Sequence, residues 1–308
     1  MSRFYDALKR AGQALPSEPR EANPEIPSPL EQNRREAEEV LAGSNDVNPR
    51  PTDSPSAVEL SPGVRPEQFP APPSIPKNGH FGAAVQVQFN GKARVIPNIP
   101  DSRVLEQYRL LRTKLLQQQQ EKPFKSLLIT SPGVQDGKTV TTLNLALAFG
   151  LLPGSKVLVV EGDLRKGSLQ QVLGLGMRPG FSDLIAGQVA LEEVILKPEG
   201  IPVHVMVRGN SCHSPGELLH SSRLPTLVQE LTNTFDLVLI DSPPVNLVTD
   251  AQLLASTCDA VLLIARAFST SQKALEETRK NLLPFRVIGT VLNGGVAISS
   301  YYGYGGYY

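Results

Sequence analysis

The stretch Ser131-Pro-Gly-Val-Gln-Asp-Gly-Lys138-Thr139 has the residue types that hold a phosphate group. An apolar run, Ser126–Thr130, precedes it, and a helical pattern, Val140–Gly150, follows it. In such a strand–loop–helix unit, backbone N–H groups face the anion, the lysine reaches the β- and γ-phosphates, and the threonine hydroxyl holds Mg²⁺. Pro132 stands at the first glycine of the usual pattern G-x-x-x-x-G-K-[ST]. The stretch predicts a nucleotide-phosphate site, with an ordinary turn before a helix-capping threonine as the alternative.

Carboxylates end two apolar runs farther along the chain. Val157–Val160 leads into Glu161-Gly-Asp163-Leu-Arg165, and Leu237–Ile240 leads into Asp241. Because ligands bind at the carboxyl ends of strands in open α/β sheets, we expect these acids to face a common site. A carboxylate there can hold a Mg²⁺-bound water or accept a proton from an attacking hydroxyl. Strand ends are also often acidic without any function.

The elements that must position these residues alternate along the chain. The strands are predicted at Ser126–Thr130, Lys156–Val160, Val203–Val207, Leu237–Ile240, Ala260–Ala265 and Arg286–Leu292. The helices are predicted at Ser102–Gln118, Lys138–Gly150, Ser168–Leu173, Ser222–Asn233, Val248–Ser256 and Ser271–Leu283. Strands that are apolar throughout and joined by helices indicate a mainly parallel sheet covered on both faces. The predicted fold is α/β and doubly wound.

The first third of the chain has a different composition. Sixteen of the 27 prolines lie in the first 100 residues, where apolar residues are sparse. We expect a disordered Pro-rich tether over residues 1–80 with a short helix at Ser2–Leu15, because such a segment buries too little apolar area to offset its ordering entropy. Residues 81–100 are expected to form a linker or small hairpin around Asn90-Gly91, residues 101–298 the domain with the nucleotide-phosphate site, and residues 299–308 a flexible tail.

Composition narrows the classes of partner. Lys plus Arg equals Asp plus Glu at 30 each, so the overall charge favours neither a nucleic-acid nor a membrane-surface partner. Two cysteines, Cys212 and Cys258, make no disulfide framework and fit a reducing cytosol. No signal peptide and no apolar run of about 18 residues is visible, so membrane association is expected to come through a partner.

The C-terminus gathers aromatic hydroxyls. Five of the seven tyrosines lie in the last eight residues, at Tyr301, Tyr302, Tyr304, Tyr307 and Tyr308. The interspersed glycines disfavour helix and strand, so the phenols are expected to be accessible. A sticky low-complexity end is the alternative interpretation.

Several motifs in a fixed order resemble the bacterial tyrosine kinases (BY-kinases), phosphate-loop autokinases that regulate capsule and exopolysaccharide synthesis. They are Thr130–Leu147, Glu161–Arg165, Gly180–Gly187 and Phe235–Asp250. The resemblance covers about Ser102–Tyr308. It includes Glu106-x-x-Arg109-x-x-Arg112, and the family uses such a helix to join subunits into a ring that presents each tail to a neighbouring active site. A solvated helix face with local ion pairs is the alternative for that helix.

The resemblance implies an autokinase that uses ATP and Mg²⁺. The implied catalytic residues are Lys138, Glu161, Asp163, Arg165 and Asp241. The implied ATP contacts are Val134, Gln135, Asp136, Gly137, Lys138, Thr139, Val140, Arg266 and Asn293. The implied metal ligands are Thr139, Asp241 and, through water, Asp163. The implied autophosphorylation sites are the five tail tyrosines, each of which would gain about −1.5 to −2 charge.

The same resemblance implies partners and a location. They are a ring-like homo-oligomer through the Glu106–Arg112 helix, a separate membrane activator of the chain-length-regulator type, and a tyrosine phosphatase. Nucleic acid is not expected. The protein is expected in the cytoplasm, recruited to the inner face of the membrane by its partner.

Two residues depart from the family pattern. Glu161 stands where the proposed catalytic base is usually Asp, and a shift of about one ångström at such a group can cost about 100-fold in rate. Gln135 replaces a loop glycine and restricts φ there. An ATP-binding regulator with little kinase activity is therefore the second hypothesis. A partition ATPase of the MinD/ParA type is the third hypothesis. It ranks last because those ATPases carry an additional lysine early in the loop, and Gly133 stands at that position here.

Overall fold

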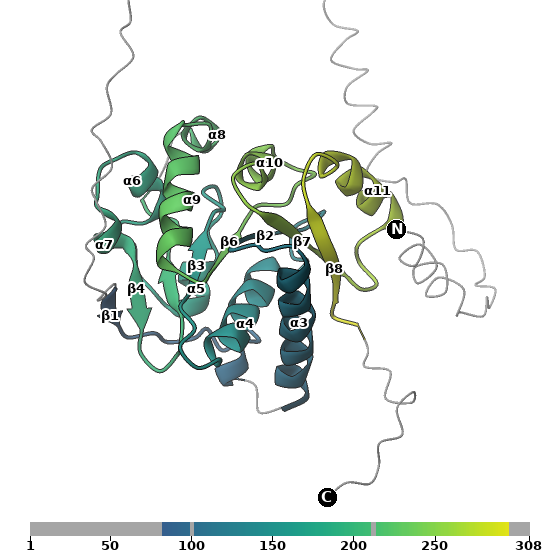
Figure 1. The fold of residues 1–308 in the computed structure, drawn as a ribbon, viewed down its shortest axis with the longest axis horizontal. Helices are drawn as coiled ribbons and strands as arrows, with labels where there is room; N and C mark the ends of the chain where they lie inside the picture. The colour runs from purple at the N-terminus through teal and green to yellow at the C-terminus, as the bar shows by residue number, and fades with distance from the viewer. Residues whose placement is uncertain (1–81, 99–101, 211–213, 296–308) are drawn as a thin grey trace, which may run out of the picture. The chain divides into compact units, whose positions relative to one another are not determined.

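The computed structural model describes residues 82–98, 102–210 and 214–295. Within them, an eight-stranded sheet has the order β1-β4-β5-β3-β6-β2-β7-β8 (Figure 1). Its neighbouring strands are parallel except for β4 and β5. The strands are β1 (Ala83–Val85), β2 (Ser126–Thr130), β3 (Val157–Glu161), β4 (Leu196–Pro198), β5 (His204–Met206), β6 (Leu237–Asp241), β7 (Ala260–Arg266) and β8 (Val287–Asn293).

Helices join these strands. They are α3 (Ser102–Glu121), α4 (Lys138–Gly150), α5 (Leu169–Leu173), α6 (Phe181–Ile185), α7 (Leu191–Val194), α8 (Pro215–Leu219), α9 (Arg223–Thr234), α10 (Asp250–Ala255) and α11 (Gln272–Asn281), with a 3-10 turn η1 at Ile96–Asn98. Every residue of β2, β3 and β6 is buried, as expected where helices cover both faces of a parallel sheet. The predicted doubly wound α/β fold is confirmed.

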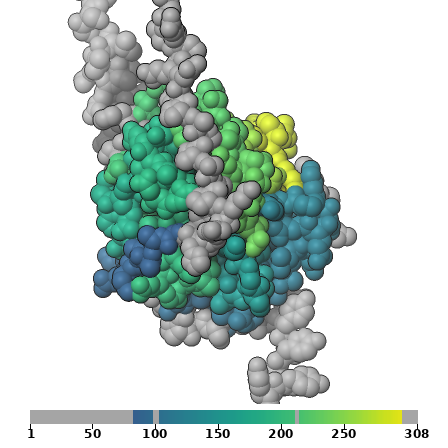
Figure 2. Space-filling view, turned by 60° about the vertical axis from the view of Figure 1, so that its left-hand side comes forward, coloured from purple at the N-terminus to yellow at the C-terminus, as the bar shows by residue number. Residues whose placement is uncertain are grey.

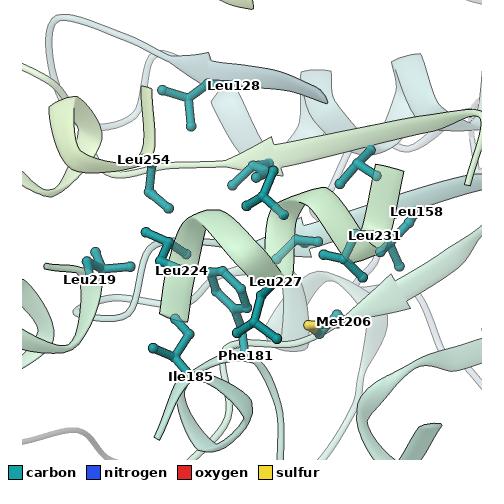
Figure 3. Packing of buried hydrophobic residues seen from close by; sticks show 14 of the residues in the cluster. Leu128, Leu158, Phe181, Ile185, Met206, Leu219, Leu224, Leu227, Leu231 and Leu254 are labelled. Carbon is teal, nitrogen blue, oxygen red and sulfur yellow. The ribbon is translucent and has the colours of Figure 1, made fainter. Parts of the chain in front are cut away.

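The two faces of the sheet support separate hydrophobic clusters. Because side chains alternate along a strand, Leu127 and Ile129 of β2 point to one face and Leu128 points to the other. The first face packs against α3, α4 and α5, and the second against α6, α8, α9 and α10 (Figure 1). Figure 3 shows the second cluster, in which Phe181 of α6 and leucines of α8, α9 and α10 pack together with Leu128 and Leu158 of the sheet.

The predicted hairpin around Asn90-Gly91 is wrong. A turn forms there, with the Ala93 N–H donating to the Asn90 carbonyl at 2.8 Å. The strand before it, β1, instead pairs in parallel with β4. An isolated two-stranded hairpin buries little apolar area, whereas pairing with the sheet lets the segment join a larger core.

Residues 86–98 continue this packing along the domain surface, where the segment is dark blue in Figure 2. The N–H groups of Gln88 and Asn90 donate to carbonyls at the end of α5, and the Ile96 N–H donates to the Asn144 side chain of α4 at 2.8 Å. Val95 is fully buried. The segment expected to be a linker is therefore packed against the helices that follow the phosphate loop and β3.

Some predictions concern residues outside the described ranges. They are the Ser2–Leu15 helix, the Pro-rich tether of residues 1–80 and the tyrosine tail. Among the residues that the structure describes, no helix combines the length and apolarity needed to cross a bilayer. The short elements β4, α6, α7 and α8, of three to five residues each, were not predicted because they are too short to show a periodic pattern.

Candidate active site

The three strands β2, β3 and β6 bring the predicted acids to one edge of the sheet. In the register of this sheet, Glu161 lies opposite Asp241, and Asp241 lies opposite Ile129 at the end of β2. The loop from Ser131 to Gly137 leaves β2 at this same edge. Parallel pairing thus places the phosphate loop and the carboxylates side by side, although Thr139 and Asp241 are 102 residues apart in sequence.

The loop has two residues with positive φ, which fix its path. Gly137 has φ +92°, and a Cβ at this position would lie 2.0 Å from Nδ2 of Asn293, so only glycine fits. Gln135 has φ +62°, the left-handed conformation that a side chain disfavours. The Gln135 carbonyl accepts a hydrogen bond from Arg266 at 3.1 Å, which helps to hold the strained residue in place.

Lys138, the first residue of α4, folds back over the loop. Its Nζ donates to the Ser131 hydroxyl at 3.0 Å and to the Gly133 carbonyl at 3.3 Å. Burial lowers the pKa of this lysine, and the negative charges of Asp241, Asp136 and Asp163 oppose that shift. Because both acceptors are neutral, a phosphate anion can replace them as the partner of the Lys138 amine.

Thr139 and Asp241 make the contact expected of a metal-holding pair. The Thr139 hydroxyl donates to Oδ2 of Asp241 at 2.5 Å and lies 2.7 Å from the Ser168 hydroxyl. Asp241 is buried, and its Oδ1 finds no hydrogen-bond partner within the described chain. Burial raises the pKa of Asp241 to about 7, against the opposing effects of the Thr139 hydrogen bond and of Lys138.

These donors fit Mg²⁺. The ion prefers oxygen ligands and binds through one or two carboxylates together with phosphate oxygens and water. An orphaned carboxylate oxygen beside a hydroxyl supplies such ligands. Within the described ranges, no group of three or more His, Cys, Asp or Glu residues could hold a metal by itself. The site therefore fits a metal ion that would be bound partly by these side chains and partly by the oxygens of a bound phosphate.

Glu161 has a different environment from the one expected for a base. Its side chain is fully buried, and its two oxygens accept the backbone N–H groups of Leu169 and, at 2.9 Å, of Arg208. Burial raises the pKa of Glu161, and those two N–H groups oppose the shift. The carboxylate ties the end of β3 to the start of α5 and to the residues after β5. This placement argues against Glu161 as the group that meets an incoming hydroxyl.

Asp163 is the more accessible of the two strand-end acids. It is half-buried, and its Oδ1 accepts the N–H groups of Arg165 at 3.2 Å and Lys166 at 2.8 Å. The Arg165 guanidinium points toward α10, where Nε and Nη2 donate to the two oxygens of buried Asp250 at 2.7 and 3.0 Å. Arg165 is thus held in one orientation by a bidentate pair, and about half of its side chain is exposed.

Arg266 and Asn293 meet the phosphate loop from the last two strands. They lie opposite one another in the β7–β8 register, and Asn293 donates to the Asp136 carbonyl at 2.8 Å. Thr270 adds a hydrogen bond from its hydroxyl to Oδ1 of Asp136 at 3.1 Å. The other oxygen of Asp136 accepts the Gly133 N–H at 2.9 Å. Arg266 and Asn293, both predicted to contact ATP, therefore adjoin the loop.

The remaining predicted residues lie in three places. Val134 is exposed on the loop, and Val140 is half-buried in the first turn of α4. On α3, Glu106 and Arg109 form an exposed ion pair, whereas Arg112 donates to the Ala148 carbonyl near the end of α4. The five tail tyrosines lie outside the described residues.

Sequence reasoning missed four residues that shape the site. Asp250 anchors Arg165, Ser168 contacts Thr139, Thr270 holds Asp136, and the backbone of Arg208 binds Glu161. Ser168 begins one predicted helix and Asp250 lies in the first turn of another, where polar residues are usually interpreted as caps. No local pattern singles out the other two.

Comparison with known proteins places this geometry in a family. No family model matches the chain. The putative tyrosine-protein kinase CapB of Staphylococcus aureus is 32% identical over 196 residues, which cover 63% of this chain and 86% of that protein. The tyrosine-protein kinase YwqD of Bacillus subtilis is 30% identical over 210 residues, 67% of this chain and 88% of that protein.

A longer relative and a solved structure agree with these matches. The putative tyrosine-protein kinase EpsB of Ralstonia nicotianae is 34% identical over 220 residues, 71% of this chain but only 29% of EpsB. The chain thus spans less than a third of that relative. The kinase domain of the Escherichia coli tyrosine kinase ETK superposes with a TM-score of 0.60 and 29% identity over 66% of this chain and 80% of that one. The chain belongs to the bacterial tyrosine kinase (BY-kinase) family.

Proposed function

We propose that the protein is an ATP-dependent protein-tyrosine autokinase that phosphorylates the C-terminal tyrosines of a second copy and acts in exopolysaccharide or capsule synthesis. The observation that carries this proposal is the meeting of Lys138, the Thr139–Asp241 pair and Asp163 at one edge of the sheet. The family supports the reaction class, because its member YwqD is named a tyrosine-protein kinase and its member CapB a putative one.

The chemistry follows from what each side chain can do. Loop N–H groups and Lys138 would bind and orient the β- and γ-phosphates of ATP. Thr139 and Asp241 would hold Mg²⁺, which when bound neutralises charge on the phosphates. A tail phenol oxygen would form a bond to the γ-phosphorus while the bond from that phosphorus to the bridging oxygen breaks and ADP leaves. The phenol proton would pass to Asp163.

Asp163 suits this proton transfer better than Glu161. Glu161 is fully buried, and both of its oxygens already accept backbone N–H groups. Asp163 is half-buried, and its negative charge acts on Lys138. The proton acceptor in this protein is therefore the second acid of the Glu-Gly-Asp sequence, and the first acid acts as an internal tie.

One observation favours the second hypothesis, an ATP-binding regulator with little catalysis. Glu161 stands where the family pattern has a base, but its carboxylate accepts the backbone N–H groups of Leu169 and Arg208 inside the domain. If Asp163 does not replace that base, the protein would bind ATP and signal through its assembly state. A docking role of the tyrosine tail would then replace phosphoryl transfer.

Assembly and partners follow from the same proposal. The exposed Glu106–Arg109 pair on α3 would contact the next subunit of a ring, while Arg112 holds α3 against α4. A separate membrane activator of the chain-length-regulator type would recruit the cytoplasmic protein to the inner face of the membrane, and a tyrosine phosphatase would reverse the modification. Sedimentation of Glu106→Ala should show a smaller species than the wild type.

The test is incubation of the full chain with labelled ATP and Mg²⁺, followed by mapping of phosphate on the last eight residues. Wild type should label the tail, whereas Lys138→Met should not, with its melting temperature retained. A matched variant with five tail Tyr→Phe changes should bind ATP and remain unlabelled there. Self-phosphorylation by purified Lys138→Met would contradict the proposal, and an unlabelled wild type that binds ATP would support the regulator.

The same assay distinguishes the roles of Asp163 and Glu161. Asp163→Asn should lower tail labelling by about 10²- to 10⁴-fold, the usual contribution of a positioned acid or base. Glu161→Gln should retain most labelling but melt at a lower temperature, because an amide places a donor where two backbone N–H groups need acceptors. The reverse ranking would restore Glu161 as the base.

A further inference from the structure

The turn after β7, Arg266–Thr270, is held rigidly against the phosphate loop. Within it, the Thr270 N–H donates to the Arg266 carbonyl at 2.9 Å, and the Arg266 N–H donates to the Thr270 hydroxyl at 2.8 Å. The Ala267 N–H donates to the Asn293 carbonyl at 2.8 Å, which joins the turn to the end of β8. Arg266 and Thr270 also bond to Gln135 and Asp136 of the loop.

Phe268 stands at the middle of this turn in an unfavourable state. Its φ is +61°, a conformation that glycine adopts without cost and that a β-carbon disfavours. Phe268 is also 91% exposed, which makes it the most exposed large hydrophobic residue among the described residues. The hydrogen bonds of the turn hold the backbone of Phe268 in this conformation, but no packing within the domain explains its exposed side chain. Residues that the surrounding contacts hold in a strained conformation are typical of ligand-binding sites.

The position of the turn indicates the ligand. A nucleotide whose phosphates lie in the loop extends its base away from Lys138, and the ends of β7 and β8 adjoin the loop through Arg266 and Asn293. An exposed aromatic ring on such a rigid turn offers a flat apolar face. Purine bases have a π-face that stacks on aromatic side chains.

We propose that Phe268 stacks on the base of the purine nucleoside triphosphate bound in the phosphate loop. The proposal rests on the proposed function, since it requires a nucleotide at this loop. The hydrogen bonds of the turn fix the backbone at Phe268 before the nucleotide binds, so little backbone freedom is lost on stacking. The interaction recognises the base face and adds nothing to the binding of the phosphates.

The test compares binding of ATP with binding of inorganic tripolyphosphate, both with Mg²⁺, by titration calorimetry on the full chain. Phe268→Ala should weaken ATP binding by about 5- to 150-fold, the range that corresponds to loss of one base–aromatic stack. Tripolyphosphate affinity should not change, and Phe268→Trp should restore ATP affinity. Leu283→Ala removes another exposed apolar side chain, 72% exposed, and should leave both affinities unchanged.

Phe268→Gly distinguishes an effect on folding stability from an effect on ATP binding. Glycine relieves the positive φ, so this variant should melt at a higher temperature than Phe268→Ala while binding ATP as weakly. If wild type binds ATP and Phe268→Ala binds it equally well, the stacking role is wrong, and a change in sedimentation would then assign the ring to contact between copies. If wild type binds neither ATP nor tripolyphosphate, the proposed function itself fails.

Discussion

Asp241→Asn should stabilise the nucleotide-free protein increasingly as the pH rises. Asp241 is buried, one of its oxygens lacks a partner within the described chain, and burial raises its pKa to about 7. Asparagine keeps the shape of this side chain and does not ionise. The substitution therefore removes the cost of charging a buried carboxyl group, and the variant should also lose tail phosphorylation.

The sign and the size follow from proton linkage. An unfolded aspartate has a pKa of about 3.9, so between about pH 4 and 7 the folded protein binds a proton that the unfolded chain has released. Wild-type stability therefore falls as the pH rises through this window, and the cost is fully present above about 7. Each pH unit is worth about 1.4 kcal/mol, so the gap between variant and wild type should grow by roughly 3 kcal/mol from pH 5 to pH 8.

The assay is urea unfolding of both proteins at pH 5, 6, 7 and 8 in the presence of a chelator, without nucleotide. Any fixed cost of the buried amide is the same at every pH and cancels from the change in the gap. Glu277→Gln, which removes an exposed carboxylate on α11, controls for the loss of one charge. A gap that stays constant within about 0.5 kcal/mol, or that narrows as the pH rises, would refute the reasoning.

Three further substitutions test the fold, each by chemical denaturation. Gln135→Gly should be about 1 kcal/mol more stable than Gln135→Ala, because only glycine relieves φ +62°, and equal stabilities would contradict this. Asp259→Ala should cost about 1 kcal/mol at pH 7 by removing the acceptor for the N–H groups of Lys125 and Ser126. Burial acts against the charge of Asp259, but these bonds outweigh it and lower its pKa, so the part of this cost that depends on the charge should be lost as the pH falls below about 4; a cost that does not fall there would count against it. Leu158→Ala, at a fully buried position in β3, should cost about 2–5 kcal/mol, and a loss below 1 kcal/mol would show that the core collapses around the gap.

Local sequence was sufficient for the central elements and for the phosphate loop. The apolar runs that became β2, β3, β6 and β7 were predicted to within one residue at each end, because a strand buried on both faces must be apolar throughout. Gly137, Lys138 and Thr139 are consecutive residues at the junction of the loop and α4, although the contacts of Gly137 with Asn293 and of Thr139 with Asp241 come from distant parts of the chain. Their spacing alone predicted their arrangement at the start of α4.

Only the tertiary structure decided which acid is free to act and which residues hold the site together. Glu161 and Asp163 look alike in sequence, and what separates them is that the N–H groups of Leu169 and Arg208 reach Glu161. The Arg165–Asp250 pair spans 85 residues, and the bond between Thr270 and Asp136 spans 134. Such contacts depend on the order of strands in the sheet, which cannot be predicted from helix or strand propensity.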